Sequence, residues 1–437
     1  MSVVRAFRAL CFCLALAVAA FAFPASRVDK GGWIIVRLSG TPKEIGFKHG
    51  QLLAPEIQDT LTTLKADLLA RSGKDWAWYR ETAHHIFWPK LDPEYKQEIA
   101  SIAEGARSKG VQIDTDDVLA INGHVELWMY YLPLVKAESL NLTPVSMAPN
   151  ACSAFVATGS ETADGKVVMG QNFWWDYIIG ERWRVIFDIT PAKGNRFMMD
   201  SLPGLIMSGT DWAINSAGLA LTETTIGDFV GFKEDGAPEF ERMRKAIQYS
   251  NNLTDICTNL ETDNNGAYAN TWLMADTKSN EIGKLELGLK NVTYVHSNDG
   301  YYYGANFPEN PKLIAEEAPG YSADTEAPRK RRWVHDLTVN KGKIDADMAK
   351  LFVDDSYDER TKQNDGEGGA LCGKSPDWGA VSARVLTSDM VKKMQFWARM
   401  GIPDGTTLDA AKLEAANPEL RGVGAHDLPA SPWMIIQ

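Results

Sequence analysis

Hydrophobic residues recur every three or four positions through the first third of the chain, which is the spacing of one face of an α-helix. Asp92 before Pro93 and Asp114 before Thr115 are typical residues at the start of a helix. The region ends in a polar, proline-containing loop at 138–151. The predicted elements are a first strand at 33–38, a helical stretch from Pro42 to Leu68, and helices over 75–87, 93–109 and 115–132.

The pattern changes at Cys152, where short runs of strand-forming residues separated by turns take over. Strands are predicted at 153–158, 167–173, 183–190, 196–200, 271–276, 282–288, 292–297 and 300–304, and helices over 238–250, 253–262, 328–339 and 344–353. A stretch rich in glycine and charge predicts a long loop at 354–377. Strands and helices in blocks, with few βαβ alternations, favour an α+β fold of stacked layers.

No stretch of linker composition divides residues 23–437. The change of pattern at 151/152 therefore indicates a processing point within one domain, between a helical segment, 23–151, and a β-rich segment, 152–437.

The first 22 residues have the pattern of a secretory signal peptide. Arg5 and Arg8 precede an apolar run from Ala9 to Ala22, and the run ends in a small-x-small cleavage sequence. The run is too short to span a bilayer as a helix, and no later stretch is longer and uncharged. We expect export to a periplasm, the extracellular space or a lysosome-like compartment, removal of residues 1–22, and no integral membrane segment.

The formal net charge of −12 argues against nucleic acid as a partner, because phosphate binding needs clustered Lys and Arg. The one basic run, 329–332, is short and runs into Trp333, Val334 and Leu337 at helical spacing, so it predicts a solvated helix face. No phosphate-binding loop, metalloprotease motif or paired C-x-x-C motif is present. His84 and His85 are adjacent, so their side chains would point in different directions on a helix. Neither a metal site nor a cofactor is expected.

Three cysteines remain once the signal peptide is removed, and an odd number leaves at least one thiol unpaired in an oxidising compartment. Two interpretations stay open. Either Cys152, Cys257 and Cys372 are three buried thiols, or Cys257 pairs with Cys372 and Cys152 is free for chemistry.

Cys152 has a context that suits catalysis, since it begins the first strand of the β-rich segment directly after a polar loop. If the chain were cut before it, the new α-amine, with an ordinary pKa near about 8, would lie within reach of its own thiol. That amine can accept the thiol proton without a histidine. The alternative is a cysteine that packs as a small hydrophobe in the core.

A resemblance to a known family extends over most of the chain after the signal peptide. These segments resemble, in order and spacing, the penicillin acyltransferase-like (acyl-coenzyme A:6-aminopenicillanic acid acyltransferase) cysteine peptidases: Gly40–Gly50, Cys152–Ala154, Asp164–Lys166, Gly170–Trp174, Asn215–Leu219 and Glu223–Thr225. The related phospholipase B-like proteins share this layout. Both are N-terminal-nucleophile (Ntn) hydrolases, so the resemblance implies a four-layer αββα sandwich and a catalytic chain that begins at Cys152.

The resemblance also implies roles for individual residues. The thiol of Cys152 would cleave the Ala151–Cys152 peptide bond, leaving two associated chains from one precursor. Asp176 would help to orient the nucleophile's surroundings, although it lies two places later than the family's acid. Asn306 would donate to the oxyanion, the alternative being a turn residue before Pro308.

Other positions depart from the pattern or stay open. The late strand has no clean match to the family's arginine, and Arg384 is the nearest one. Thr222 and Thr224 replace amide side chains. Trp174 and Trp175 line an acyl pocket in one interpretation and pack without any ligand in the other.

The function implied is cleavage of a linear amide bond in a small acylated or lipid-like substrate, through a Cys152 thioester. Three alternatives remain: phospholipase B-like ester hydrolysis on phospholipids or lysophospholipids, acyl transfer to an amine, and a non-catalytic binding protein that uses its 14 Trp residues to hold a ligand.

Overall fold

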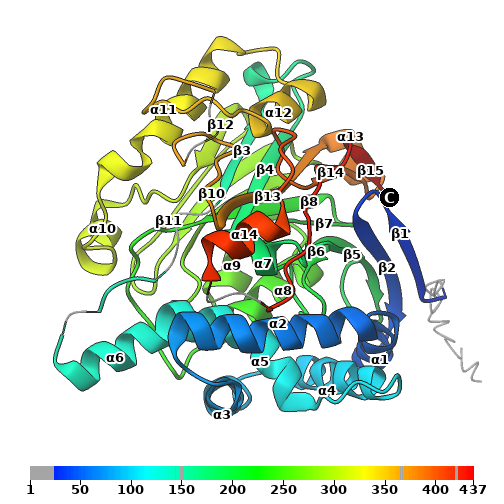
Figure 1. Cartoon of the computed structure of the whole chain (residues 1–437). Coiled ribbons are helices and arrows are strands. Elements are labelled where there is room, and N and C mark those ends of the chain that lie inside the picture. The colour runs from blue at the N-terminus through cyan, green and yellow to red at the C-terminus, as the bar shows by residue number, and fades with distance from the viewer. Residues whose placement is uncertain (1–23, 143, 148–151, 365, 367, 419–421) are drawn as a thin grey trace, which may run out of the picture.

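Two β-sheets lie face to face in this protein, with helices over both outer faces (Figure 1). The computed structural model describes residues 24–142, 144–147, 152–364, 366, 368–418 and 422–437. Within these ranges one sheet has nine strands, in the order β1-β2-β5-β6-β7-β8-β9-β10-β11, and the other has six, in the order β12-β3-β4-β13-β14-β15. The predicted α+β, four-layer αββα sandwich is confirmed.

The strands of the larger sheet are β1 (Ser26–Lys30), β2 (Trp33–Gly40), β5 (Val185–Pro191), β6 (Phe197–Ser201), β7 (Ala213–Asn215), β8 (Leu219–Thr225), β9 (Asn270–Asp276), β10 (Glu281–Leu287) and β11 (Val292–Ser297). Those of the smaller sheet are β12 (Gly300–Gly304), β3 (Ser153–Thr158), β4 (Val168–Asp176), β13 (Trp378–Thr387), β14 (Phe396–Met400) and β15 (Met434–Ile436). Neighbouring strands are antiparallel, except that β2 runs parallel to β5.

The helical layer over the larger sheet contains α1 (Pro42–Leu52), α2 (Ala54–Ser72), α3 (Trp76–Ile86), α4 (Pro93–Arg107), α5 (Thr115–Glu126), a π-helical turn at Leu127–Tyr131, α6 (Leu132–Leu140), α8 (Glu239–Tyr249) and α9 (Leu253–Glu261). On the other side lie α10 (Pro311–Glu317), α11 (Ala323–Val339) and α12 (Ala346–Val353). The shorter elements are the 3₁₀ turn Gly159–Glu161, α7 (Tyr177–Gly180), α13 (Ser388–Lys392) and α14 (Ala410–Ala416). None of the helices in the described ranges is both long and apolar enough to cross a lipid bilayer.

The motif at Gly40–Gly50 has a structural reason. Thr41 caps α1 and Glu44 reaches back to the Thr41 backbone, which is a capping box. Gly46 and Gly50 face α4, where a Cβ added to either residue would overlap a backbone carbonyl oxygen of that helix. The two glycines therefore allow the close helix packing that holds this layer together. The predicted helical stretch from Pro42 to Leu68 is two helices, which are separated at Leu53.

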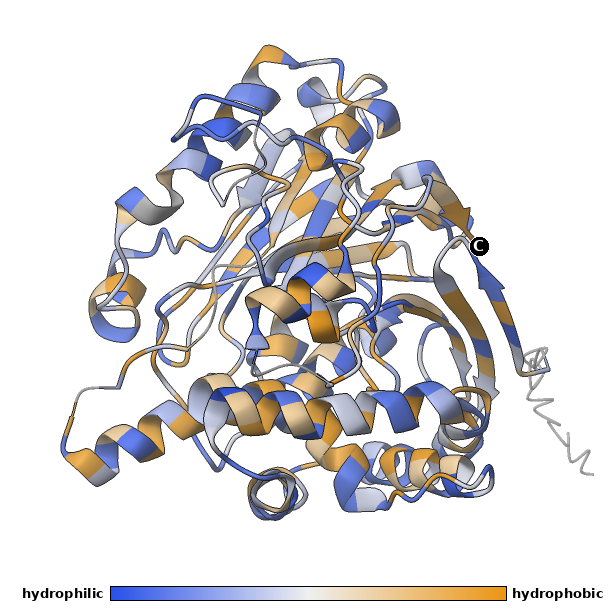
Figure 2. Ribbon diagram, in the orientation of Figure 1, coloured by the Kyte–Doolittle hydropathy of each residue, from blue (hydrophilic) through white to orange (hydrophobic). Residues whose placement is uncertain are grey.

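The core follows the alternation of side chains along the strands. In β3, Ala154 and Val156 belong to the core between the sheets, while Phe155 and Ala157 pack with the residues of α11 and α12. Figure 2 shows hydrophobic residues in the central strands and polar residues on the outward turns of the helices. The residue that precedes β3, Cys152, is thereby carried into the interior of the sandwich.

Candidate functional site

Cys152 is fully buried immediately before β3, whose first residue, Ser153, pairs with Asn172 of β4. Its φ is 74°, in the left-handed region that residues with a side chain rarely adopt. A backbone strained in this way costs about 1–3 kcal/mol and persists only where the surroundings hold it. Ala151, the other residue of the predicted cleavage point, lies outside the described residues. Cys152 directly precedes the strand that it was predicted to begin, and the strained backbone lies beside that bond.

Two neighbours contact the thiol of Cys152. The backbone N–H of Trp174 donates to it, and the side chain of Glu223 in β8 lies against it. Burial, and then the charge of Glu223, raise the pKa of this thiol well above its ordinary value. The thiol of the uncut chain is therefore protonated, and it needs a proton acceptor before it can attack a carbonyl carbon.

Glu223 forms a carboxyl pair with Asp211, and both side chains are fully buried. Burial is the main cause that raises the pKa of each carboxyl well above its ordinary value. None of their four carboxyl oxygens makes a hydrogen bond of normal geometry to another described residue. The pair is therefore a buried acidic group without hydrogen-bond compensation, close to Cys152.

Arg329 of α11 holds the nucleophile's backbone. Its Nη1 donates to the carbonyl oxygen of Cys152 at 2.8 Å and to Oδ1 of Asn306 at 3.0 Å, and its guanidinium lies 5.1 Å from the ring centroid of Trp174. Arg329 is only 2% exposed, so the prediction of a solvated face is wrong for this residue. The physical reason is that α11 packs on the smaller sheet, and the next residue, Lys330, bonds to Glu309 at the surface instead.

Asn306 follows β12 and is also fully buried, with a φ of 68°. Its Nδ2 donates to the backbone oxygen of Thr225 at 2.7 Å, and its own backbone oxygen accepts from Gly227. The second hydrogen on Nδ2 is the one that an oxyanion would take. Through Arg329 the structure brings Asn306 to Cys152, and its oxyanion role stays a prediction.

Asp176 ends β4, and its contacts are with the helices. Its Oδ1 accepts from the backbone of Ile179 at 2.9 Å and lies 3.8 Å from Arg71 of α2. Burial, and then the neighbouring Asp67, raise the pKa of Asp176 to about 7. The structure thus connects Asp176 to α2 rather than to the thiol of Cys152, and its proposed orienting role stays a prediction.

The four candidate pocket residues lie in β4 and β8, and their role in a pocket stays a prediction. Trp174 lies under the guanidinium of Arg329, and Trp175 stacks with Trp183 at 5.0 Å between ring centroids, as expected for aromatic packing. Thr222 and Thr224 are buried in β8 on either side of Glu223. A Cβ added to Gly304 would overlap the hydroxyl of Thr224, so this threonine packs against β12.

Arg384 of β13 is the cation that the sequence pattern left unassigned. It is fully buried in an ion pair with Asp200, and its guanidinium lies 5.6 Å from the ring centroid of Trp33. Burial lowers the pKa of Arg384 to about 9, while the charge of Cys152 acts in the opposite direction. Arg384 therefore lies within electrostatic range of the nucleophile and favours the thiolate.

The sequence analysis did not single out Glu223 or Asp211 as functional residues. A signal was present for Glu223, because an acid inside the apolar strand 219–225 is buried only at a cost and is rarely placed there by chance. Asp211 carried no pattern of its own, since it follows a loop with no periodicity.

The thiols of Cys257 and Cys372 are both free and buried, so the interpretation that pairs them is wrong. Among the described residues, no group of three or more His, Cys, Asp or Glu side chains is arranged to hold a metal ion.

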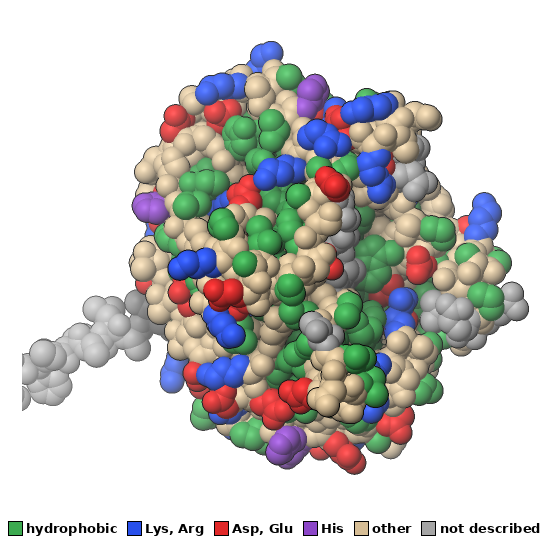
Figure 3. Space-filling view, turned by 90° about the vertical axis from the view of Figure 1, so that its left-hand side faces the viewer, with side chains coloured by type: hydrophobic (Ala, Val, Ile, Leu, Met, Phe, Trp, Pro, Cys, Tyr) green, Lys and Arg blue, Asp and Glu red, His purple; other side chains and the backbone are tan. Residues whose placement is uncertain are grey.

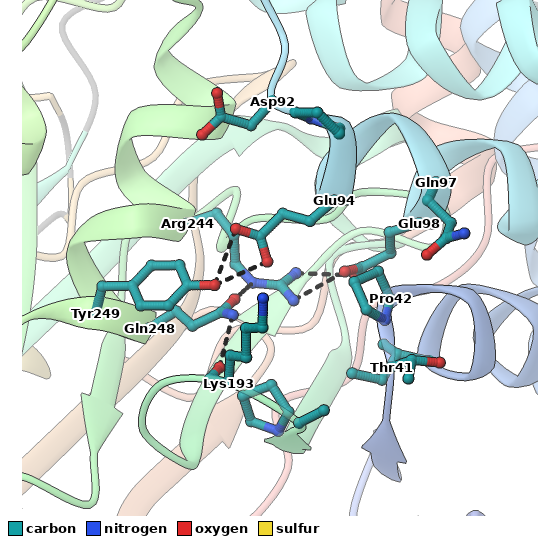
Figure 4. A pocket seen from close by; sticks show the side chains of 14 residues that line it. Thr41, Pro42, Asp92, Glu94, Gln97, Glu98, Lys193, Arg244, Gln248 and Tyr249 are labelled. Carbon is teal, nitrogen blue, oxygen red and sulfur yellow. Dashed lines mark hydrogen bonds and ion pairs between the residues drawn. The ribbon is translucent and has the colours of Figure 1, made fainter.

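A wide pocket of about 660 Å³ lies between α1, α4 and α8 (Figure 4). Its central charges are already paired, since Arg244 binds Glu98 with two bonds of 2.9 Å and Tyr249 donates to Glu94. None of its lining residues belongs to the Cys152 cluster. The size of this pocket therefore says nothing about the chemistry at Cys152.

Comparison with known proteins gives the family. The phospholipase B family model matches residues 59–330. An uncharacterized protein of Archaeoglobus fulgidus is 26% identical over 313 residues, which are 65% of this chain and 49% of that protein. Phospholipase B-like 1 of Bos taurus is 23% identical over 359 residues, which are 72% of this chain and 60% of that protein. The chain thus spans about half to three fifths of the length of these two relatives.

Among solved structures, a mutant of the conjugated bile acid hydrolase from Clostridium perfringens superimposes with a TM-score of 0.34 and 9% identity, covering 57% of this chain and 89% of that one. The family match covers more than half of the present sequence. The chain belongs to the phospholipase B family.

Proposed function

We propose that this protein is an exported, self-processing Ntn hydrolase, in which Cys152 cleaves a linear amide bond of an acylated substrate. The observation that carries the proposal is the setting of Cys152. The residue directly precedes β3 in a left-handed conformation, its thiol lies near the N–H of Trp174 and the carboxyl of Glu223, and its carbonyl oxygen is bound by Arg329. This setting supports a nucleophile, because its backbone is held in place and its thiol is next to groups that exchange protons.

The proposed reaction begins with the mature chain, in which Cys152 is the N-terminal residue. Its α-amine accepts the thiol proton, and the sulfur attacks the acyl carbonyl carbon. Asn306 donates to the oxygen on which negative charge develops. The ammonium then gives its proton to the leaving amine, and water hydrolyses the thioester to release the acid and restore the thiol. The thiol is fully buried in the uncut chain, so cleavage has to precede substrate binding.

The experiment that tests this proposal combines mass analysis with a substrate screen. Purified wild-type protein should consist of chains ending at Ala151 and beginning at Cys152, and it should hydrolyse N-acyl amides. Cys152→Ala should remain one chain and be inactive. Fully active wild-type protein with an intact Ala151–Cys152 bond would contradict the proposal, and a binding protein would show neither cleavage nor hydrolysis.

A second candidate is hydrolysis of the carboxyl ester of a phospholipid or lysophospholipid. Membership of the phospholipase B family favours it, and so do exposed apolar side chains in and after α6, where Leu140 is 66%, Leu142 64% and Val145 76% exposed. The face of the molecule shown in Figure 3 presents hydrophobic side chains among its charges. The two candidates are separated by comparing kcat/KM for an N-acyl amine and for a lysophospholipid that carry the same acyl chain. Added amine acceptors detect acyl transfer.

A further inference from the structure

Self-cleavage at Cys152 needs a base that the proposed turnover mechanism does not supply. Before the Ala151–Cys152 bond is cut, the nitrogen of Cys152 is part of an amide and cannot accept a proton. The thiol is fully buried and protonated, so the first cleavage depends on a different proton acceptor in contact with sulfur. That acceptor has to be a side chain of the uncut protein.

The described structure leaves one side chain in that position. The N–H of Trp174 is a donor and stabilises the thiolate, and Arg384 is a cation engaged with Asp200. The seven histidines all lie in the described ranges. None of them is among the groups that act on the thiol, and the two buried ones bind the backbone of Gly204 and Ile121. The carboxyl of Glu223 is the side chain that lies against the thiol.

We propose that Glu223 is the general base and then the general acid of the self-cleavage at Cys152. This inference rests on the proposed role of Cys152 as nucleophile. The Glu223 carboxylate accepts the thiol proton while the sulfur attacks the carbonyl carbon of Ala151. The protonated Glu223 then donates to the nitrogen of Cys152 as the C–N bond breaks, which leaves Ala151 as a thioester and Cys152 as a free amine. Water hydrolyses the thioester, giving the carboxylate of Ala151, the thiol and one proton.

Asp211 completes this arrangement. A carboxyl that is always ionised is a weak base, whereas one whose proton affinity is raised towards the working pH is a more effective one. Burial raises the pKa of Glu223 and the charge of Glu239 adds to this effect, whereas the contact with Asp211 acts in the opposite direction. The other titratable groups that face Glu223 are Tyr130 and Tyr268, both buried phenols. The contact between the two carboxyls raises the pKa of Asp211 and lowers that of Glu223, so Asp211 is the one that keeps its proton and Glu223 is the one available as an acceptor.

The test uses the full chain, synthesised in a cell-free system, with the appearance of the chain beginning at Cys152 followed by gel and by mass. Glu223→Gln should slow self-cleavage by about 100-fold or more, since general base catalysis typically contributes about 10²–10⁴-fold. Glu181→Gln is the matched control, because Glu181 is also a buried acid but acts on neither Glu223 nor the thiol. It should cleave within about threefold of the wild type.

A chemical rescue distinguishes a catalytic carboxyl from a structural one. Glu223→Ala removes the carboxyl and leaves space, so added formate should increase the cleavage rate of this variant by at least about tenfold. Self-cleavage of Glu223→Gln at the wild-type rate, or a slow Glu223→Ala protein that formate does not accelerate, would overturn the inference and leave the proposed nucleophile intact. Cleavage of Cys152→Ala at the same bond would instead overturn the proposed function itself.

Discussion

Arg329 and Cys152 are 177 residues apart in the sequence, and the guanidinium of one donates a 2.8 Å hydrogen bond to the carbonyl oxygen of the other. The same nitrogen donates to Asn306 at 3.0 Å. One buried cation of α11 therefore fixes the backbone of the nucleophile and the side chain proposed for the oxyanion in a single network.

Loss of Arg329 should lower turnover strongly. Arg329→Met leaves two buried oxygen acceptors without this donor, and each such loss costs about 1–3 kcal/mol, so kcat/KM should fall by at least about tenfold. The matched control is Lys330→Met, which removes a surface ion pair with Glu309 and a cation–π contact with Phe307. Both variants should be compared after complete cleavage, and equal rates for the two would show that the Arg329 contact has no role in turnover.

Removing the side chain of Asn306 should lower kcat by about 100- to 1,000-fold, which is the usual effect of losing one oxyanion donor. Because the φ of this residue is 68°, Asn306→Gly tests the side chain without adding backbone strain. Asn310→Ala, at the start of α10, is a control for the loss of an asparagine that caps a helix. Near wild-type turnover in Asn306→Gly would make Asn306 a turn residue, as the alternative interpretation holds.

Stability should depend on pH through Asp176. Burial raises the pKa of this carboxyl to about 7, whereas in the unfolded chain it returns to near its ordinary 3.8. A folded pKa above the unfolded one stabilises the fold at low pH, and this stability is lost as pH rises through about 7. Between about pH 4 and 7 the slope is about 1.4 kcal/mol per pH unit for one proton.

Urea unfolding of Cys152→Ala protein at several pH values measures this slope, since that chain stays uncut. Asp176→Asn should reduce the slope by this one-proton contribution, whereas Asp164→Asn, on an exposed turn, should leave it unchanged. An unchanged slope in Asp176→Asn would show that other groups carry the pH dependence.

The activity of the mature enzyme should rise with pH, because the α-amine of Cys152 accepts a proton only when it is neutral. Burial lowers the pKa of an amine, and an ionised Glu223 nearby raises it, so the rise should lie between about pH 6 and 8. The value belongs to the coupled groups together. Glu223→Gln removes the negative charge and should move the rise to lower pH in whatever fraction of that protein is cleaved.

Single His→Ala variants control for a histidine base. All seven, including His49 and His296, should keep turnover in correctly folded and cleaved protein. Loss of activity in any one of them would show that a histidine, and not the α-amine, is the base, as in a Cys–His mechanism.

The sequence predicted most of the fold because periodicity is strong where elements are long. The helix expected at 93–109 is α4 at Pro93–Arg107, and the strand expected at 292–297 is β11. Short edge strands were harder, and β1 at Ser26–Lys30 was missed, since most of its residues are exposed and lack an apolar alternation. Cap residues and turns located the boundaries to within a few residues.

The site was only partly predictable. Cys152 and Asn306 stood out from their local motifs, and the structure brings them together through Arg329. The partners of Cys152 come from distant strands and loops, and only the tertiary fold places Glu223 and Asp211 beside it. Arg329 was misjudged, because the helical pattern of a basic run does not show which of its residues turns inward.

The parallel pairing of β2 with β5 has a consequence for the life of the mature enzyme. It joins residues 34–40, from before the cleavage point, to residues 185–191, from after it, inside one continuous sheet. The proposed cleavage would leave these strands without a covalent connection, so the two chains of an unfolded enzyme would have to meet in a bimolecular encounter. Under that proposal maturation exchanges a reversible folding equilibrium for persistence that depends on the barrier to unfolding, and the working lifetime becomes a kinetic quantity.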